Sequence, residues 1–384
     1  MRTQPLSRRQ FAVGLGAAIA TVARPSFARA SFAPLILQRP ARPEGAIRLD
    51  ANENPYGPSP KAIAAITGSE TIAMRYPDDA YASIRGEIAQ LHKVAPEQVI
   101  LGCGSSEILR IADMATLTAD GNVVAAEPTF EAVLRYARAT RAKPIKVPLT
   151  SDFRHDLPQM AAQCTSRTGL VYLCNPNNPT GTIVTRDEMS RFFGDVPKST
   201  MILVDEAYFH FADHPRYASA TEWLDKIPNL VVARTFSKVY GLAGMRLGYA
   251  VGSKDTIDAM AAHLLADSCN AAVLAAGRAS LADQDRVAEC RARILSTRSR
   301  VTAQLKSKGF HVLESQANFF MVDTGSDVRP TIDEFRRRGI LVGRRFPSMA
   351  NWLRVTIGTD DEMHAFSSAF DQILCSNKPC VSPS

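Results

Sequence analysis

The segment M-I-L-V-D-E-A-Y, residues 201–208, joins a short apolar run to two consecutive carboxylates. An apolar run of this length predicts a buried strand of a parallel sheet, with the acids at its carboxyl end. Open α/β sheets bind their ligands at that end of the strands. The segment therefore predicts an α/β fold with a functional site beside Asp205.

Two further segments place polar residues at the same edge. N-P-N-N-P-T-G, residues 175–181, follows the apolar run 169–174, and T-F-S-K-V-Y-G-L-A-G-M-R-L-G, residues 235–248, follows the run 230–233. Proline, asparagine and glycine favour tight turns after a strand. We expect the three loops to converge on one rim of the sheet.

Apolar runs separated by helix-like or turn-rich segments predict seven strands, at residues 98–101, 122–126, 143–148, 169–173, 201–204, 230–233 and 247–251. Most connections are long enough for a crossover helix, so the sheet should be mainly parallel and covered on both faces. From about residue 268 the pattern changes to long helices and two strand-like runs, which predicts a smaller α+β domain. The predicted parts are a leader at 1–30, an arm at 31–46, a large domain at 47–267, a small domain at 268–375 and a tail at 376–384.

The N-terminus has the ordered features of an export signal. Arg8 and Arg9 precede Phe11 and an uncharged run rich in alanine and glycine, and A-R-A at residues 28–30 supplies small residues for cleavage. This resembles a twin-arginine signal cleaved after Ala30. Such a signal implies a periplasmic or secreted protein and the twin-arginine export machinery as a partner. The alternative interpretation is a basic tail or a first helix.

Charge and cysteine content exclude several classes of protein. Residues 1–30 hold five arginines and no acid, so the net charge of +7 falls to +2 after cleavage, which removes the main support for nucleic-acid binding. No apolar window in the body is long enough for a membrane span. The cysteines lack the close pairs of a metal site; Cys375 and Cys380 are the reasonable disulfide partners in an oxidising compartment.

Lys238 carries the chemistry of the segment 235–248. A lysine can hold an aldehyde cofactor as a Schiff base and later move a proton, whereas an arginine stays charged and can do neither. Ser237 beside it and Arg246 eight residues on suit a phosphate clamp. The turn G-C-G-S-S-E, residues 102–107, also follows a strand and opens a helix, so its backbone N–H groups would face an anion.

The order N-P-N-N-P-T-G, D-E-A-Y, S-K and a following arginine resembles the fold-type I, class I/II pyridoxal-phosphate aminotransferases, in particular the histidinol-phosphate branch. The resemblance runs from about residue 47 to about residue 370. It implies a large domain with a mainly parallel seven-stranded sheet, a smaller α+β domain and pyridoxal 5′-phosphate as cofactor. The implied substrates are an amino donor and a 2-oxo acid, 2-oxoglutarate above all.

The resemblance also implies roles for individual residues. Lys238, Asp205 and Tyr208 would be catalytic: the lysine as the Schiff-base residue, the aspartate on the pyridine nitrogen and the tyrosine on the phenolic oxygen of the ring. The cofactor-binding set implied for the ring and its phosphate is Gly104, Ser105, Ser106, Phe130, Asn178, Asp205, Tyr208, Ser237, Lys238, Arg246 and Tyr76. Tyr76 matches a family tyrosine that reaches the neighbouring subunit, so a homodimer is implied; Phe130 stacks on the ring or is a core phenylalanine.

Arg354, Tyr56 and Asn178 are the implied substrate-binding residues, and Arg354 would clamp a carboxylate or a phosphate. In the histidinol-phosphate pattern an arginine directly follows the valine, whereas Gly343 stands there in this chain. The sequence is therefore compatible with two kinds of amino donor: histidinol phosphate, and an aromatic or other L-amino acid. A lyase or decarboxylase on the same scaffold is the alternative reaction class.

Overall fold

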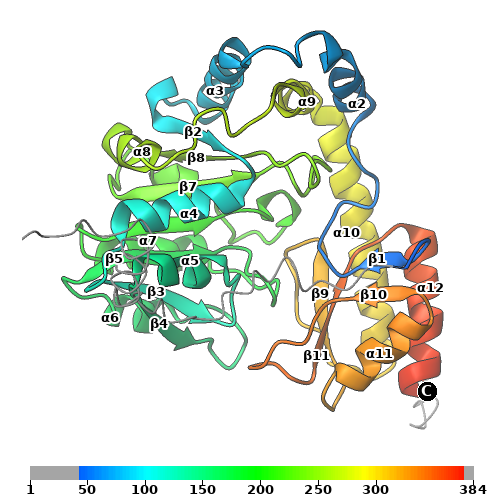
Figure 1. Ribbon diagram of the computed structural model, residues 1–384. Helices are drawn as coiled ribbons and strands as arrows, with labels where there is room; N and C mark the ends of the chain where they lie inside the picture. The colour runs from blue at the N-terminus through cyan, green and yellow to red at the C-terminus, as the bar shows by residue number, and fades with distance from the viewer. Residues whose placement is uncertain (1–42, 376–384) are drawn as a thin grey trace, which may run out of the picture. The chain divides into compact units, whose positions relative to one another are not determined.

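The computed structural model describes residues 43–375. A seven-stranded sheet runs through the larger part of the chain (Figure 1). Its order is β2 (Val99–Gly102), β8 (Gly248–Gly252), β7 (Leu230–Thr235), β6 (Met201–Asp205), β5 (Thr168–Cys174), β3 (Asn122–Glu127) and β4 (Lys143–Pro148). Only β8 lies antiparallel to its neighbours, so the predicted strands and the mainly parallel sheet are confirmed.

Alternating side chains of the central strands enter two separate cores. In β6, Ile202 and Val204 join one core, and Met201 and Leu203 join the other. This is the period of a strand that is buried on both faces, which explains its continuous apolar run.

Helices cover both faces of the sheet. α4 (Ser105–Thr116), α5 (Ala132–Thr140) and α8 (Lys254–Ala261) supply the core of one face. The other face receives α3 (Asp78–His92), α6 (Leu157–Ala162), α7 (Arg186–Asp195) and α9 (Ala271–Leu281). Side-chain caps at the first turns of α6, α7 and α8, from Asp156, Thr185 and Ser253, explain where these helices begin.

The C-terminal elements form a separate layer of short sheets and helices. β9 (Phe319–Asp323) pairs antiparallel with β11 (Trp352–Thr356), beside α10 (Gln284–Ser307), α11 (Arg329–Arg337) and α12 (Asp360–Phe370). β1 (Ile47–Leu49) pairs parallel with β10 (Ile340–Val342), although the prediction placed residue 47 in the large domain. Likewise α9 packs against α2 (Pro60–Thr67) and α3, although the prediction assigned it to the small domain (Figure 1).

The described chain from Gly45 onward forms one compact unit, so the predicted boundary at 267/268 stays a prediction. The leader, most of the arm and the tail with Cys380 lie outside the described residues. Within residues 43–375, the helices are all too short or too polar to cross a membrane.

Candidate functional site

Four loops meet at the carboxyl-end edge of the sheet. They follow β2, β5, β6 and β7. The loops after β5, β6 and β7 are the three that were expected to converge, and the loop after β2 is the glycine-rich turn at residues 102–107. A fifth segment, residues 50–54 between β1 and α2, closes over this edge through hydrogen bonds to Tyr208, Lys238 and Val239.

The Lys238 amine lies against this segment. The Nζ atom donates to the carbonyl oxygens of Asn52 at 3.0 Å and Ala51 at 3.4 Å, and it lies 5.4 Å from the centre of the Tyr208 ring. Burial, and then the positive charge of Arg354, lowers the pKa of the amine to about 8. A neutral amine is the form that attacks an aldehyde, so the environment favours that form near physiological pH.

Asp205 is a buried carboxylate at the end of β6. It accepts hydrogen bonds from the Tyr172 hydroxyl at 2.9 Å and from the Ala207 backbone N–H at 3.1 Å. Burial raises the pKa of Asp205 to about 6, against the lowering effect of these donors. A cation placed beside this carboxylate, such as a protonated ring nitrogen, would be stabilised by it and would hold it ionised.

The neighbouring carboxylate of D-E-A-Y has a structural role. Glu206 accepts two hydrogen bonds from the buried Arg234 guanidinium, at 2.8 and 3.1 Å, and one from the Ala220 N–H at 2.6 Å. Because successive residues point in opposite directions at a strand end, only Asp205 faces the site.

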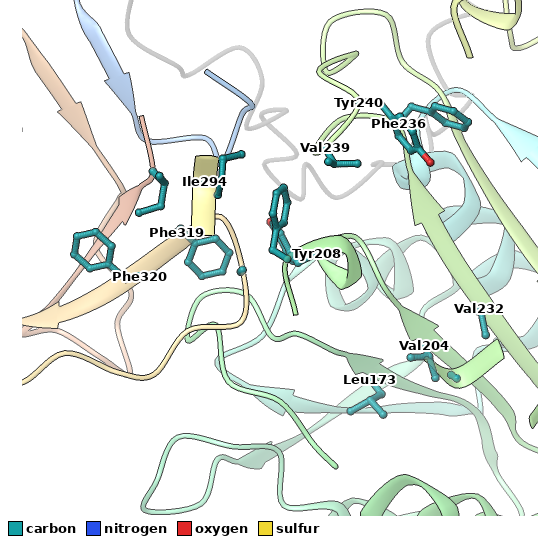
Figure 2. Packing of buried hydrophobic residues seen from close by; sticks show 14 of the residues in the cluster. Leu173, Val204, Tyr208, Val232, Phe236, Val239, Tyr240, Ile294, Phe319 and Phe320 are labelled. Atoms are coloured by element: carbon teal, nitrogen blue, oxygen red, sulfur yellow. The ribbon is translucent and has the colours of Figure 1, made fainter. Parts of the chain in front are cut away.

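The Tyr208 hydroxyl lies at the centre of an amide network. Its oxygen accepts from Asn52 Nδ2 at 3.0 Å and from Asn178 Nδ2 at 3.3 Å. Phe319 of β9 packs edge-on against the Tyr208 ring, with centroids 5.1 Å apart (Figure 2). Burial raises the pKa of the phenol, so the hydroxyl stays protonated.

Arg354 on β11 enters the site from the C-terminal layer. Nη1 donates to Asn178 Oδ1 and Nη2 to the Asp50 carbonyl, both at 2.7 Å. Nε is buried and has no hydrogen-bond partner among the described residues. Burial lowers the pKa of this guanidinium to about 10, and an anion on the free edge would offset that cost.

The turn before α4 forms a cradle with Arg246 and Ser237. Gly104 has φ of +75°, and any side chain there would overlap the Arg246 guanidinium. Arg246 Nη1 lies 3.4 Å from Ser237 Oγ and donates to the Ala243 carbonyl at 2.8 Å. No side chain caps the first turn of α4, which begins with Ser105 and Ser106, so the N–H groups of these two serines remain available to an anion.

The remaining predicted residues lie outside this cluster. Tyr76 is 79% exposed on the segment before α3. Tyr56 packs its ring under the Arg293 guanidinium, 3.9 Å away, and Phe130 packs against the core under α4 and α5. Within one chain, none of the three has a hydrogen bond or ring contact to Lys238, Asp205 or Tyr208.

Asn52, Tyr172 and Thr356 belong to the cluster although the sequence analysis did not select them. Asn52 contacts Tyr208 and Lys238, Tyr172 contacts Asp205, and Thr356 contacts Asn52. Asn52 stands four positions before Tyr56, which was predicted to bind substrate.

Known proteins share this fold. The family described as aminotransferase class I and II matches residues 44–370 of the chain. The chain belongs to this family. Its predicted class as an aminotransferase is therefore confirmed.

Individual relatives of this aminotransferase carry two different activities in their names. The histidinol-phosphate aminotransferase of Brevibacillus brevis is 36% identical over 334 residues, 85% of this chain and 90% of that protein. The aromatic amino acid aminotransferase of Rhodococcus jostii is 38% identical over 322 residues, 84% of this chain and 88% of that protein. The histidinol-phosphate aminotransferase structure from Sinorhizobium meliloti, in complex with pyridoxal-5′-phosphate, has a TM-score of 0.82 at 28% identity, covering 90% of this chain and 98% of that one.

The predicted cofactor agrees with the family and with that complex. The described residues also fit it: a lysine with a lowered pKa, a buried carboxylate, and an uncapped helix start beside a guanidinium lie near one another. These are the groups that an aldehyde, a basic ring nitrogen and a phosphate require.

Proposed function

We propose that this aminotransferase moves an amino group from histidinol phosphate or an L-amino acid to 2-oxoglutarate, with Lys238 as the Schiff-base residue. The observation that carries the proposal is the meeting of Lys238, Asp205 and Tyr208 with Arg354 in one buried cluster. When bound, pyridoxal phosphate withdraws electrons from the substrate and so makes its α-proton acidic.

Each residue has a task that its surroundings support. Lys238, once released from the cofactor, takes the α-proton and returns it, because its lowered pKa allows both protonation states. Asp205 holds the ring nitrogen protonated, while Tyr208 and Asn178 bind the ring oxygen. Ser237, Arg246 and the turn Gly104–Ser106 hold the phosphate.

Arg354 is proposed to bind the anionic group of the substrate. Its free Nε and the planar fork suit two oxygens of a carboxylate or phosphate. Binding there places the substrate beside Asn178 and Tyr208, and thus beside Lys238.

An aromatic donor is the second candidate, because apolar rings surround Arg354. The guanidinium carbon lies 5.4 Å from the Phe346 ring centre and 5.6 Å from that of Phe319. Phe346 belongs to a small apolar cluster formed by Leu313, Met321, Phe346, Met349 and Trp352, with Phe153 against it. Flat apolar surfaces of this kind favour an aromatic side chain.

A donor screen tests the proposal. Purified residues 31–384 loaded with pyridoxal phosphate are mixed in turn with histidinol phosphate, phenylalanine, tyrosine and tryptophan, and the visible band of the cofactor is followed. We expect at least one donor to convert the band, and 2-oxoglutarate to restore it with formation of glutamate. The Lys238→Ala variant is the control. Release of carbon dioxide without amino transfer would replace the proposal with a decarboxylase.

We also propose a homodimer in which Tyr76 reaches the cofactor phosphate of the partner subunit. Support comes from the exposure of apolar side chains on this surface: Tyr76 is 79% exposed, Met74 80% and Leu265 65%. Exposed apolar groups gathered on one surface are typical of subunit interfaces.

We propose further that the chain is exported through the twin-arginine machinery and cleaved after Ala30. It rests on the order of Arg8, Arg9 and the A-R-A segment at 28–30. Cell fractionation of the native chain and of a variant with lysines at both arginines tests it. Equal amounts of both proteins in the exported fraction would contradict the proposal.

A further inference from the structure

The Tyr208 oxygen is fully used as an acceptor. It receives Asn52 Nδ2 at 3.0 Å and Asn178 Nδ2 at 3.3 Å. A phenol carries two acceptor lone pairs and one hydrogen. Because both lone pairs already receive a hydrogen, the hydroxyl hydrogen must be donated in another direction.

The orientation of the Asn178 amide follows from Arg354. A guanidinium only donates, and Nη1 of Arg354 lies 2.7 Å from Asn178 Oδ1. The oxygen end of the Asn178 amide therefore faces Arg354, and the nitrogen end must face Tyr208.

The orientation of the Asn52 amide follows in the same way from Thr356. Thr356 Oγ1 accepts from the Asn52 backbone N–H at 2.9 Å and donates its own hydrogen to Asn52 Oδ1 at 3.1 Å. This reciprocal pair leaves Asn52 Nδ2 directed at Tyr208. Two independent chains of hydrogen bonds thus converge on one phenol oxygen.

Burial and backbone geometry make the Asn52 arrangement rigid. Asn52 is 1% exposed and Thr356 2% exposed, so water does not compete for these hydrogen bonds. Asn52 has φ of +55°, and its carbonyl accepts from both Lys238 Nζ at 3.0 Å and Asn318 Nδ2 at 3.1 Å. Asparagine tolerates this left-handed conformation better than most residues.

We propose that Asn52 is a positioning residue of the transamination site, which with Thr356 holds the Tyr208 hydroxyl so that its hydrogen points at the ring oxygen of the cofactor. The inference rests on the proposed function and assigns Asn52 a role that it performs through Tyr208. A hydrogen donated to the ring oxygen withdraws electron density from it. That oxygen then holds the proton of the Lys238-linked nitrogen less tightly.

The test is a pH titration of the visible absorbance of the cofactor-loaded protein. Asn52→Gly removes the amide while keeping a residue that adopts a positive φ without strain. We expect the midpoint of the titration to rise by about half a pH unit or more, in the direction of Tyr208→Phe. Asn122→Ala is the matched control, because the buried Asn122 accepts from the Thr168 hydroxyl at 2.7 Å at the start of β3 and makes no contact with Tyr208.

A double variant separates positioning from general disturbance. In a Tyr208→Phe background, Asn52→Gly should leave the midpoint unchanged, because the hydroxyl on which it acts is gone. Thr356→Val keeps Asn52 but removes the bond that orients its amide, and should raise the midpoint by less; it also serves if Asn52→Gly does not fold. The dissociation constant of the cofactor is measured alongside for every variant.

The outcomes are distinct. An unchanged midpoint in Asn52→Gly and in Thr356→Val, or an equal rise with and without the Tyr208 hydroxyl, overturns the role of Asn52. A native spectrum that does not depend on Lys238, shown by the same spectrum in Lys238→Ala, overturns the proposed function itself and the inference with it.

Discussion

At the scale of single residues, Lys238 illustrates how burial prepares a common side chain for chemistry. Its amine is shielded from water by burial, and a second cation, Arg354, acts on it across the site. Both effects favour the neutral amine. The same residue on a solvated loop would be charged almost completely at neutral pH.

This environment predicts the pH dependence of cofactor attachment. Because the pKa of Lys238 is lowered to about 8, the rate at which the cofactor-free protein binds pyridoxal phosphate covalently should rise with pH with a midpoint near 8 and level off above it. Arg354→Gln removes a charge that lowers this pKa, so its midpoint should move to higher pH. Arg345→Gln, an arginine paired with Asp327 at 2.9 Å, is the control. A rate that does not change with pH would contradict the argument.

Gly104 is the second residue whose local geometry makes a prediction. It has φ of +75°, and a side chain would overlap Arg246. Gly104→Ala should therefore cost about 1–2 kcal/mol in the free energy of unfolding and weaken cofactor binding by roughly tenfold or more. Denaturant unfolding and a fluorescence titration of the cofactor measure the two effects.

Gly86 is the matched control for this substitution. It lies within α3, and a Cβ atom there would meet no other atom within 4 Å. Gly86→Ala should leave cofactor binding unchanged and stabilise the helix by up to about 1 kcal/mol. Equal losses in both variants would mean that the turn before α4 has no special requirement for glycine.

At the scale of elements, α4 combines two opposite demands. Its first turn offers free N–H groups at the cradle, whereas Asp113 near its other end is fully buried and has no hydrogen-bond partner for either carboxylate oxygen among the described residues. Burial raises the pKa of Asp113 to about 8. A buried carboxyl of this kind is protonated in the folded protein at neutral pH.

The sign of the effect on stability follows from the two states. Between about pH 4 and about pH 8 the Asp113 carboxyl is ionised when unfolded and protonated when folded, so each pH unit costs the fold about 1.4 kcal/mol. The free energy of unfolding of Asp113→Asn, minus that of the native chain, should therefore increase with pH across this window. Asp120→Asn, at an exposed position after α4, should show no such increase. A constant difference for Asp113→Asn would contradict the prediction.

At the scale of the whole molecule, the proposed shared site makes a quantitative prediction. Tyr76→Ala and Lys238→Ala subunits are each expected to be nearly inactive alone. When they are mixed and reassembled in equal amounts, half of the dimers combine one of each, and one of their two sites has both native residues. Activity should then recover to about one quarter of the native level. No recovery, with hybrid dimers demonstrated, would show that Tyr76 acts within its own subunit, and native activity of Tyr76→Ala alone would show that it has no role in the site.

The strands of the large sheet could be predicted from the sequence alone. The seven strands were predicted because each is a short apolar run bounded by turn residues, and such runs are local features. The site loops followed, since parallel strands bring their carboxyl ends to one edge. The pairing of β1 with β10 was not predicted, because it depends on residues almost three hundred positions apart in the chain.

The sequence by itself determined the family, the sheet and the catalytic candidates, because apolar periodicity and chemistry-bearing motifs are carried by neighbouring residues. Only the tertiary structure decided which of them meet. Asn52 is hydrogen-bonded to Tyr208, 156 positions along the chain, and to Thr356, 304 positions along it. The Tyr56 ring packs against the Arg293 guanidinium and does not join this cluster. The physical reason is that packing decides which polar groups lose contact with water, and those groups then need hydrogen-bond partners inside the protein. Packing is a property of the whole chain, so neighbouring residues alone do not determine these partners.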